Sequence, residues 1–291
     1  MAASGGFRRP NDHHEVTEAI RERLSGGAVQ EMHKCIDLLA DLCLHGVPEG
    51  RYAPQGDGET LPMNVLSALD GRKLTAEFIG TFALIFIGAG SMILGGSTVA
   101  VALAHGLALA LLLSALGHVS GGFFNPALTL GLWVTRRLDT VETVTYIAVQ
   151  LLGSVAAALA LVMLFPDSLR EVNGLGTPLL SDVTTFMQGV GLEGILAAFL
   201  MLAVLGTVID RRGPRLGGFG IGLVLTMDIL AGGKLTGAAM NPARAFGPAL
   251  VDRTWDDQLV YWIGPIIGAV LAALVYHYVF MDREQRVEVQ A

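Results

Sequence analysis

Two short stretches of the sequence share one pattern. Residues 121–131 read GGFFNPALTLG, and residues 237–247, which lie 116 positions later, read GAAMNPARAFG. Both contain Asn-Pro-Ala at the same place, but the next residue is Leu128 in the first copy and Arg244 in the second. A charge inside an apolar run is costly unless it is used. Both copies must therefore have a place in the fold, and the arginine must have a role in the site.

The composition indicates that the chain folds in a lipid bilayer. Of 291 residues, 52% are hydrophobic, only 15% are charged and 37 are glycine, a balance that is unusual for a water-soluble domain. A helix of about 20 apolar residues crosses the hydrocarbon core. Six stretches meet this requirement, at roughly 74–94, 98–118, 140–165, 186–209, 216–232 and 258–280.

The Lys and Arg residues beside these spans predict the orientation. Six crossings place both termini on one side, and Lys and Arg collect in the cytoplasmic connections of membrane proteins. We therefore expect an integral, multi-pass membrane protein with both termini in the cytoplasm. The side of the termini carries Arg72, Lys73, Arg136, Arg137, Arg211, Arg212, Arg215, Arg283 and Arg286, against Arg170, Lys234 and Arg253 opposite.

The sequence divides into three parts. Residues 1–71 hold eleven acidic and six basic residues, so they carry −5 of the net charge of −7, and we interpret them as a partly disordered cytoplasmic extension. Residues 72–281 form the membrane domain, and residues 282–291 form a short cytoplasmic tail. Cys35 and Cys43 each have a His two positions away, but this spacing matches no usual zinc pattern, so we expect no metal and no cofactor.

The membrane domain contains an internal duplication. Glu77 precedes Asn125 by 48 residues, and Glu193 precedes Asn241 by 48 residues. The two repeats cover about 72–165 and 186–280. Because each contains three spans, the second must enter the membrane from the opposite face, and the halves are therefore inverted relatives.

Each Asn-Pro-Ala segment is predicted to begin a short helix. Asn is a favourable N-cap, and Pro is favoured at the first helical position because its missing N–H would be unpaired there anyway. About ten residues make only ~15 Å of helix, which is half of the hydrocarbon thickness. Such a segment is tolerated inside the membrane only where it is buried in protein or lines a wet cavity. We expect all-α architecture with six transmembrane helices and two re-entrant half-helices that meet near the centre of the membrane.

These motifs resemble those of the aquaporin, or major intrinsic protein, family. The resemblance covers about residues 72–280 and includes AEFIGTF in the first span, Gln150 in the third, YWIGPIIGA from Tyr261 in the sixth and both NPA loops. It implies a homotetramer with one pore in each subunit. It assigns the pore motifs to Asn125, Pro126, Ala127, Asn241, Pro242 and Ala243.

The resemblance also assigns a selectivity filter. The residue after the second NPA lines the narrowest constriction in this family, and that position is Arg244, with His105, Ile229 and Ala238 as the other three members. Strict water channels of the family usually have Phe and His where this chain has His105 and Ile229. The set is similar to that of the plant tonoplast branch, some members of which also pass ammonia, urea or hydrogen peroxide.

The remaining polar residues of the spans have structural interpretations. The resemblance suggests that Glu77 and Glu193 accept hydrogen bonds from the backbones of the re-entrant loops. Asp228 could bind loop backbone or Lys234, and the residues leave this choice open. The apolar wall of the pore is expected to include Phe82, Val101, Leu107 and Ile221.

We therefore predict a passive channel for water, with ammonia or other small neutral solutes as further cargo, that excludes protons and ions. The expected partners are water, such solutes, the lipid bilayer and three further copies of the chain, without nucleic acid, and the protein is not an enzyme. A glycerol facilitator is the alternative, although Ala245 stands where glycerol channels generally have Asp. An inverted-repeat secondary transporter usually needs more spans. An intramembrane protease based on Ser120 and His277 would leave the twin NPA unexplained.

Overall fold

The structure is a computed structural model that describes residues 70–288. Within this range the backbone forms helices joined by short segments and contains no strand. The predictions for the N-terminal extension and for Cys35 and Cys43 lie outside the described residues. In chain order the elements are α4 (Gly71–Ile93), α5 (Thr98–Ser120), α6 (Pro126–Val134), α7 (Thr140–Leu164), α8 (Asp167–Asn173), α9 (Phe186–Val204), η1 (Leu205–Ile209), α10 (Gly218–Thr236), α11 (Pro242–Asp252), α12 (Val260–Val275), η2 (Tyr276–Phe280) and α13 (Arg283–Glu288).

Six helices of the described part are long and apolar enough to cross a membrane. They are α4, α5, α7, α9 continued by η1, α10, and α12 continued by η2, and their bounds differ from the predicted spans by a few residues at most. The predicted all-α fold with six membrane helices is thus confirmed.

Polar side chains set the starts of several of these helices. The side chains of Asp70, Ser97 and Asp139 accept hydrogen bonds from the free backbone N–H groups of the first turns of α4, α5 and α7. Thr185 and Gln188 form a reciprocal capping box at the start of α9. Such caps pair N–H groups that have no partner within the helix.

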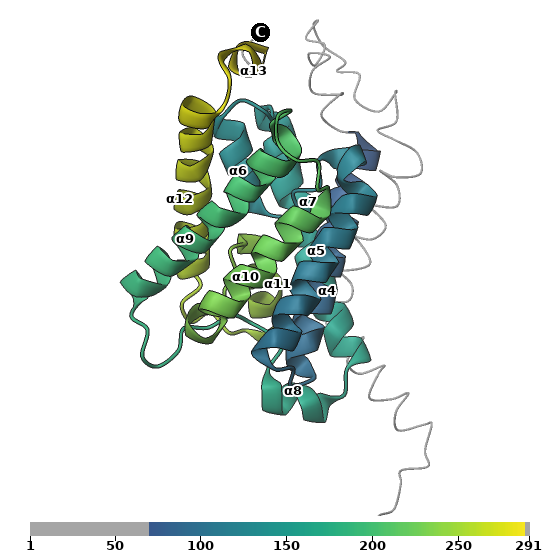
Figure 1. Cartoon of the computed structure of the whole chain (residues 1–291). Helices are drawn as coiled ribbons and strands as arrows, with labels where there is room; N and C mark the ends of the chain where they lie inside the picture. The colour runs from purple at the N-terminus through teal and green to yellow at the C-terminus, as the bar shows by residue number, and fades with distance from the viewer. Residues whose placement is uncertain (1–69, 289–291) are drawn as a thin grey trace, which may run out of the picture. The chain divides into compact units, whose positions relative to one another are not determined.

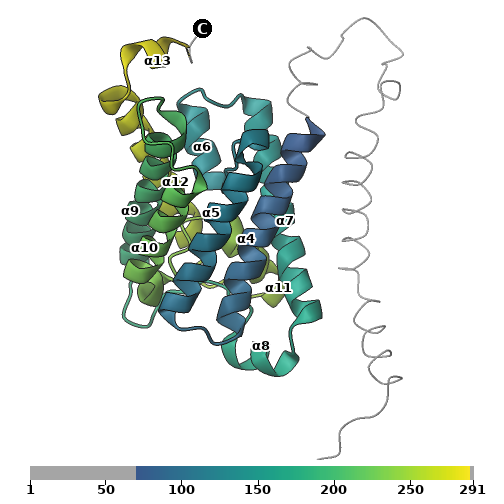
Figure 2. The ribbon, with the colours of Figure 1, turned by 45° about the vertical axis from the view of Figure 1, so that its right-hand side comes forward.

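The two Asn-Pro-Ala segments begin short helices, as the sequence indicates. Asn125 caps α6, which has nine residues, and Asn241 caps α11, which has eleven, with the proline in the first turn of each. Figures 1 and 2 show α6 in the half of the molecule near α13 and α11 in the half near α8. Neither helix spans the molecule, and each lies in one half of it.

Equivalent helices of the two halves make equivalent contacts. Helix α4 packs on α7 as α9 packs on α12, α6 packs on α12 as α11 packs on α7, and the second helices of the halves, α5 and α10, pack on each other (Figure 2). The chain thus builds one bundle from two related three-helix units, and the half-helices lie inside it.

Glycines permit a close crossing of α5 and α10. A Cβ on Gly106 of α5 would lie 2.5 Å from the carbonyl oxygen of Gly222 of α10, and a Cβ on Gly222 would lie 2.3 Å from the carbonyl oxygen of Gly106. Helix pairs in membranes gain their stability from close backbone packing because lipid supplies no hydrophobic drive between them. These two glycines, 116 positions apart, are equivalent residues of the repeat.

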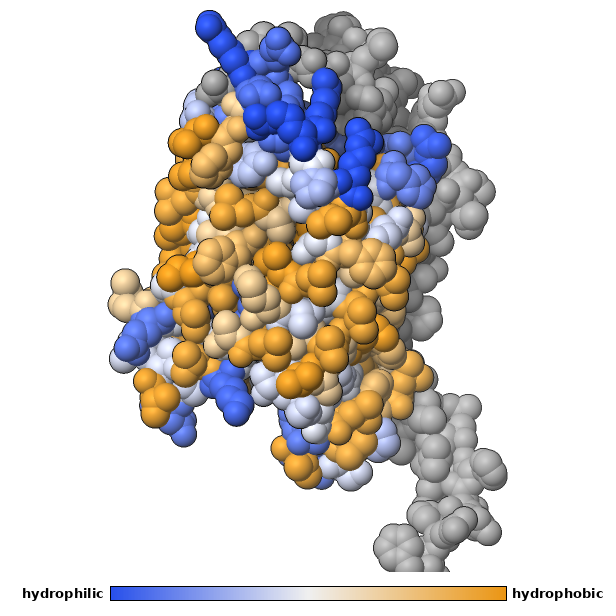
Figure 3. All heavy atoms as spheres, in the orientation of Figure 1, coloured by the Kyte–Doolittle hydropathy of each residue, from blue (hydrophilic) through white to orange (hydrophobic). Residues whose placement is uncertain are grey.

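The outer surface is apolar over the middle of the bundle. Figure 3 shows hydrophobic side chains across the central part of one face and hydrophilic side chains at its two ends. Leu107 belongs to this outer surface, with 52% of its area exposed. Its predicted place in the wall of a pore is therefore wrong, because it points away from the interior of the bundle.

Candidate functional site

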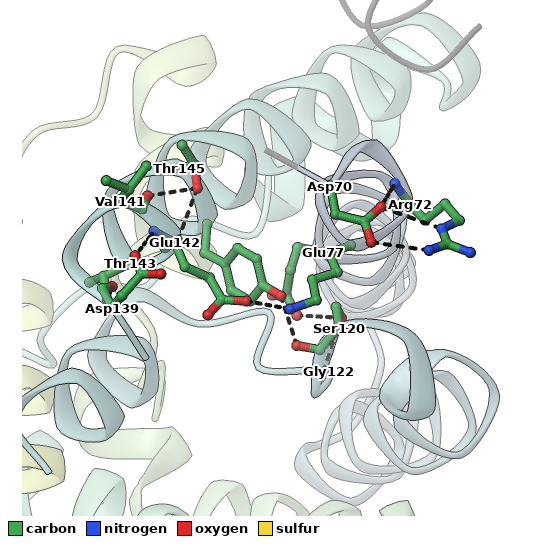
Figure 4. A network of polar contacts seen from close by, with 12 residues as sticks. Asp70, Arg72, Glu77, Ser120, Gly122, Asp139, Val141, Glu142, Thr143 and Thr145 are labelled. Carbon is green, nitrogen blue, oxygen red and sulfur yellow. Dashed lines mark hydrogen bonds and ion pairs between the residues drawn. The ribbon is translucent and has the colours of Figure 1, made fainter. Parts of the chain in front are cut away.

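Glu77 of α4 holds the segment that leads into the first half-helix. Its Oε1 accepts hydrogen bonds from the Ser120 hydroxyl (2.7 Å) and the Phe123 N–H (3.0 Å). Its Oε2 accepts from the Phe124 N–H and from the Gln150 side chain, both at 2.8 Å. Figure 4 shows Glu77 between the helix and this segment, beside Ser120. A fully buried carboxylate is thereby paired on both oxygens.

Glu193 of α9 does the same for the second half-helix. Its Oε1 accepts from the Thr236 hydroxyl (2.6 Å) and the Ala239 N–H (3.0 Å), and its Oε2 accepts from the Met240 N–H (2.6 Å). These partners lie 116 positions after Ser120, Phe123 and Phe124. The two halves thus use one device, in which a buried acid from the first helix of a repeat pairs loop N–H groups that lipid could not.

The last residue before each asparagine has a strained backbone. Phe124 and Met240 have φ angles of 48° and 52°, in the left-handed region that non-glycine residues rarely adopt. The bonds to Glu77 and Glu193 hold the N–H groups of these two residues. This conformation turns each carbonyl toward the opposite loop.

At the centre of the molecule, the side chain of each asparagine donates a hydrogen bond to the opposite loop. Asn125 Nδ2 donates to the Met240 carbonyl oxygen and Asn241 Nδ2 donates to the Phe124 carbonyl oxygen, each over 2.9 Å. The Oδ1 atoms accept from the N–H groups of Ala127 and Ala243, each also at 2.9 Å. A carboxamide has two N–H donors, so each asparagine retains one N–H beyond this exchange.

A cavity lies beside the meeting point of the half-helices. His105, Ala238 and Arg244 line it together with Asn125 and Asn241. Three of the four predicted filter residues are therefore brought together. The apolar part of the lining is Leu84, Leu109, Phe123, Leu128, Leu200, Leu225 and Ala239.

The fourth predicted filter residue lies outside this lining. Ile229 is buried, with 3% of its area exposed, and it belongs to the apolar core of the bundle. Phe82, Val101 and Ile221, which the sequence suggested for the apolar wall, are also absent from the residues that line the cavity. Leucines of α4, α5, α6, α9 and α10 make that wall instead.

Two contacts fix the guanidinium of Arg244. Nη1 donates to the carbonyl oxygen of Gly176 over 2.7 Å, and Nη2 lies 3.0 Å from Sδ of Met92. Only 3% of the residue is exposed. No pattern in the sequence indicates either partner, because Gly176 lies in a connecting segment and Met92 is one apolar residue among many in α4.

His105 is fixed by its own helix. Its Nδ1 lies 2.9 Å from the carbonyl oxygen of Val101, one turn earlier in α5. A carbonyl can only accept, so Nδ1 carries the proton, and in a neutral ring Nε2 is then an acceptor. His105 is thus a polar residue in a largely apolar lining.

Two tyrosines support the loops by contacts that were not predicted from the sequence. Tyr146 donates to the Ser120 carbonyl oxygen (2.9 Å), and Tyr261 donates to the Thr236 carbonyl oxygen (2.8 Å). They stand 115 positions apart, which is also the separation of the similar stretches GSVAAALA from Gly153 and GAVLAALV from Gly268, so the repeat could have revealed them as a pair.

Asp228 has neither of the two partners considered for it. It is fully buried, and neither carboxylate oxygen has a hydrogen-bond partner among the described residues. It directly precedes Ile229 in α10.

The class of protein follows from this geometry: two half-helices capped by Asn-Pro meet beside a cavity inside an apolar six-helix bundle. Residues 65–276 match the family described as Major intrinsic protein. The chain therefore belongs to the major intrinsic protein (MIP) family, that is, to the aquaporins. Such a protein is a membrane channel for water or small solutes and is not an enzyme.

Plant aquaporins of the tonoplast type are among the similar sequences. Aquaporin TIP4-4 of Zea mays is 46% identical over 225 residues, which cover 72% of this chain and 87% of the relative. Aquaporin TIP4-1 of Arabidopsis thaliana is 42% identical over 225 residues, with coverage of 73% and 87%. The predicted resemblance to this branch is confirmed.

A solved structure shares the fold. The aquaglyceroporin from Plasmodium falciparum superposes with a TM-score of 0.65 at 22% identity, covering 72% of this chain and 96% of its own. At this identity the likeness concerns the fold and not the solute.

Proposed function

We propose that the chain forms a passive, bidirectional pore for water that also conducts ammonia and excludes protons and other ions. The observation that carries the proposal is one cavity lined by both NPA asparagines, His105, Ala238 and Arg244. These residues supply a few polar groups to a wall that is otherwise apolar. Such a wall favours small neutral solutes that can exchange their hydration for the polar contacts.

The free N–H of each asparagine is the central element of the mechanism. One N–H of Asn125 and one of Asn241 is used between the loops, and the other is available to a passing water. A water that accepts from these groups directs its own hydrogens away from the centre, so its two neighbours cannot form a continuous proton wire. The N-terminal ends of α6 and α11 add positive dipole ends that oppose cations.

Arg244 provides a second barrier. Its guanidinium is always charged and carries five N–H donors, of which the contacts to Gly176 and Met92 engage two. The rest can bind water or ammonia, while the positive charge repels cations. Since Ala238 is small, it leaves room beside the guanidinium for such solutes.

Stopped-flow light scattering on proteoliposomes tests this function. The wild type should shrink under osmotic stress much faster than empty vesicles, and an internal pH dye should show fast alkalinisation in an ammonium gradient. We expect His105→Phe to suppress alkalinisation more than shrinkage, because it removes a polar group from the wall. Leu107→Phe is the matched control, since it changes a side chain on the same helix that is exposed on the outside of the bundle.

Three results would contradict the proposal. Shrinkage no faster than in empty vesicles would show that the chain does not conduct water. Glycerol flux comparable with that of water would favour the glycerol facilitator, and saturable uptake coupled to an ion would favour a transporter.

We also propose that both termini face the cytoplasm and that the chain forms a homotetramer. The orientation rests on the excess of Lys and Arg beside the termini. Contacts between Lys73 and Glu142, between Arg137 and Met281, and between Arg212 and Asp282 join the segments that carry many of these charges at one end of the bundle. Labelling of single cysteines from either side of the membrane tests the orientation.

A further inference from the structure

We propose that Gly88 and Met92 of helix α4 position the side chains of His105 and Arg244 and thereby set the selectivity of the pore. The inference rests on the proposed function, because it concerns the passage of solutes through the same cavity. Neither residue lines that cavity. Each acts on one polar residue that lines it, Gly88 on His105 and Met92 on Arg244.

One face of α4 follows the cavity. Glu77, Leu84, Gly88 and Met92 recur at intervals of seven, four and four residues, so they lie along one side of the helix. Glu77 holds the first half-helix segment, and Leu84 lines the cavity. The next two turns of the same face reach His105 and then Arg244, so a single rigid helix connects the loop support with the polar groups of the filter.

Gly88 makes room for the imidazole of His105. A Cβ at position 88 would lie 2.2 Å from Nε2 and 2.4 Å from Cδ2 of that ring. The other side of the ring is held by the bond between Nδ1 and the Val101 carbonyl oxygen. The imidazole therefore rests on bare backbone of α4, and any side chain at position 88 must push it from this place.

Met92 orients the guanidinium without neutralising it. Its thioether is a weak acceptor and carries no charge, and its Sδ lies 3.0 Å from Nη2 of Arg244. The Gly176 carbonyl holds Nη1 from a separate segment, so the guanidinium is fixed between two elements. A carboxylate at position 92 would hold it more strongly but would cancel the charge that repels cations, and a leucine would give Nη2 no acceptor.

The first arm of the test concerns Gly88. Gly88→Ala favours the helix itself, so a loss of function would come from the displaced ring. We expect the osmotic water permeability per reconstituted subunit to fall roughly two- to tenfold and its activation energy to rise. The matched control is Gly191→Ala in α9, where a Cβ would meet nothing within 4 Å. In a His105→Ala background Gly88→Ala should have no further effect, because the ring it displaces is absent.

The second arm concerns Met92 and depends on no change at Gly88. Met92→Leu keeps an apolar side chain of similar size but removes the acceptor, so Nη2 turns toward the cavity and binds passing water more tightly. We expect a change of roughly two- to tenfold in the ratio of ammonia to water permeability. Met92→Gln supplies an uncharged acceptor again and should return the ratio toward the wild type. Met227→Leu is the control, since Met227 is 48% exposed on the outer surface.

The readouts separate positioning from simple loss of folded protein. Fewer folded copies lower all fluxes together but leave the activation energy and the solute ratio of each pore unchanged. If vesicles with the wild type shrink no faster under osmotic stress than empty vesicles, the proposed function is contradicted. A different result would overturn this inference while leaving that function in place. In that case the wild type shrinks fast, but Gly88→Ala leaves the activation energy of water permeation unchanged and Met92→Leu leaves the ratio of ammonia to water permeability unchanged.

Discussion

The side-chain amide of Asn125 donates a hydrogen bond to the backbone carbonyl of Met240 over 2.9 Å, and so joins the tips of the two inverted halves. Asn241 returns the same bond to Phe124. Each asparagine therefore has two structural tasks, to cap its own half-helix and to hold the other loop. These two hydrogen bonds of each carboxamide fix the direction of its remaining N–H, which we assign to the passing solute.

Substitution of Asn125 should separate its two structural tasks. Asn125→Ser keeps an N-cap acceptor but cannot reach Met240, and we expect a loss of about 0.5–1.5 kcal/mol of stability. Asn125→Ala also loses the cap, which costs about 1 kcal/mol more. Apparent thermal midpoints in detergent check the order wild type, Ser, Ala. Asn173→Ser is the control, since this exposed amide also donates to a carbonyl, that of Ile93, but outside the core, and a larger loss there than at Asn125 would contradict the assignment.

Much of this arrangement could be predicted because it follows from local rules applied twice. Apolar length located the six spans, and Asn followed by Pro located the starts of α6 and α11 within a symmetric pattern. The equal spacing from Glu77 to Asn125 and from Glu193 to Asn241 indicated that the halves use the same support. Repetition in the sequence carries information about contacts that a single copy does not.

The rest depends on which way side chains point after the helices have packed. Leu107 follows Gly106, whose close approach to Gly222 turns that face of α5 toward α10 and leaves Leu107 on the outside. Ile229 is buried in α10, as Leu225 is, but only Leu225 is among the residues that line the cavity. The contact from Met92 to Arg244 joins residues 152 positions apart, and no periodicity or motif in the sequence predicts it.

Replacement of one carboxylate oxygen of Glu77, which holds the first loop, should destabilise the protein strongly. Glu77→Gln puts an amide NH2 group where an oxygen accepts two of four hydrogen bonds, so a buried donor faces other donors. We expect a loss of about 2–4 kcal/mol, seen as a low yield of monodisperse protein and a lowered thermal midpoint. Glu142→Gln is the matched control. Its ion pair with the partly exposed Lys73 should be worth no more than about 1 kcal/mol, and equal effects of the two changes would argue against the support role of Glu77.

Asp210, an acid that lies outside the membrane spans, should make the stability of the protein depend on pH. The Arg212 guanidinium, which donates to both oxygens of Asp210, holds the pKa of this carboxyl well below its usual range. The same carboxyl accepts from Gln285 of the C-terminal segment at 3.2 Å. Because the folded pKa is depressed, the contribution is present above the unfolded value of about 3.8 and is lost as the pH falls from there toward the folded value.

Asp210→Asn should therefore lower the thermal midpoint at pH 7, and the difference from the wild type should shrink below about pH 4. Asp282→Asn, which removes an exposed partner of the same arginine, should have a smaller effect at pH 7. A difference for Asp210→Asn that stays constant from pH 7 down to about pH 2.5, well below the unfolded pKa, would show that the ionised carboxyl is not its source.

Asp228 differs from Glu77 and Glu193 in that its substitution should not harm the fold. Its two carboxylate oxygens are fully buried and have no hydrogen-bond partner in the described part of the chain, so a charge there would cost desolvation without compensation. Asp228→Asn keeps the shape of the side chain and removes this cost. We expect an unchanged or higher thermal midpoint in detergent, in contrast to the large fall for Glu77→Gln. A clear fall in the midpoint would mean that bound water or a cation pairs the carboxylate of Asp228, and water permeability of the same variant would then show whether that group belongs to the pore.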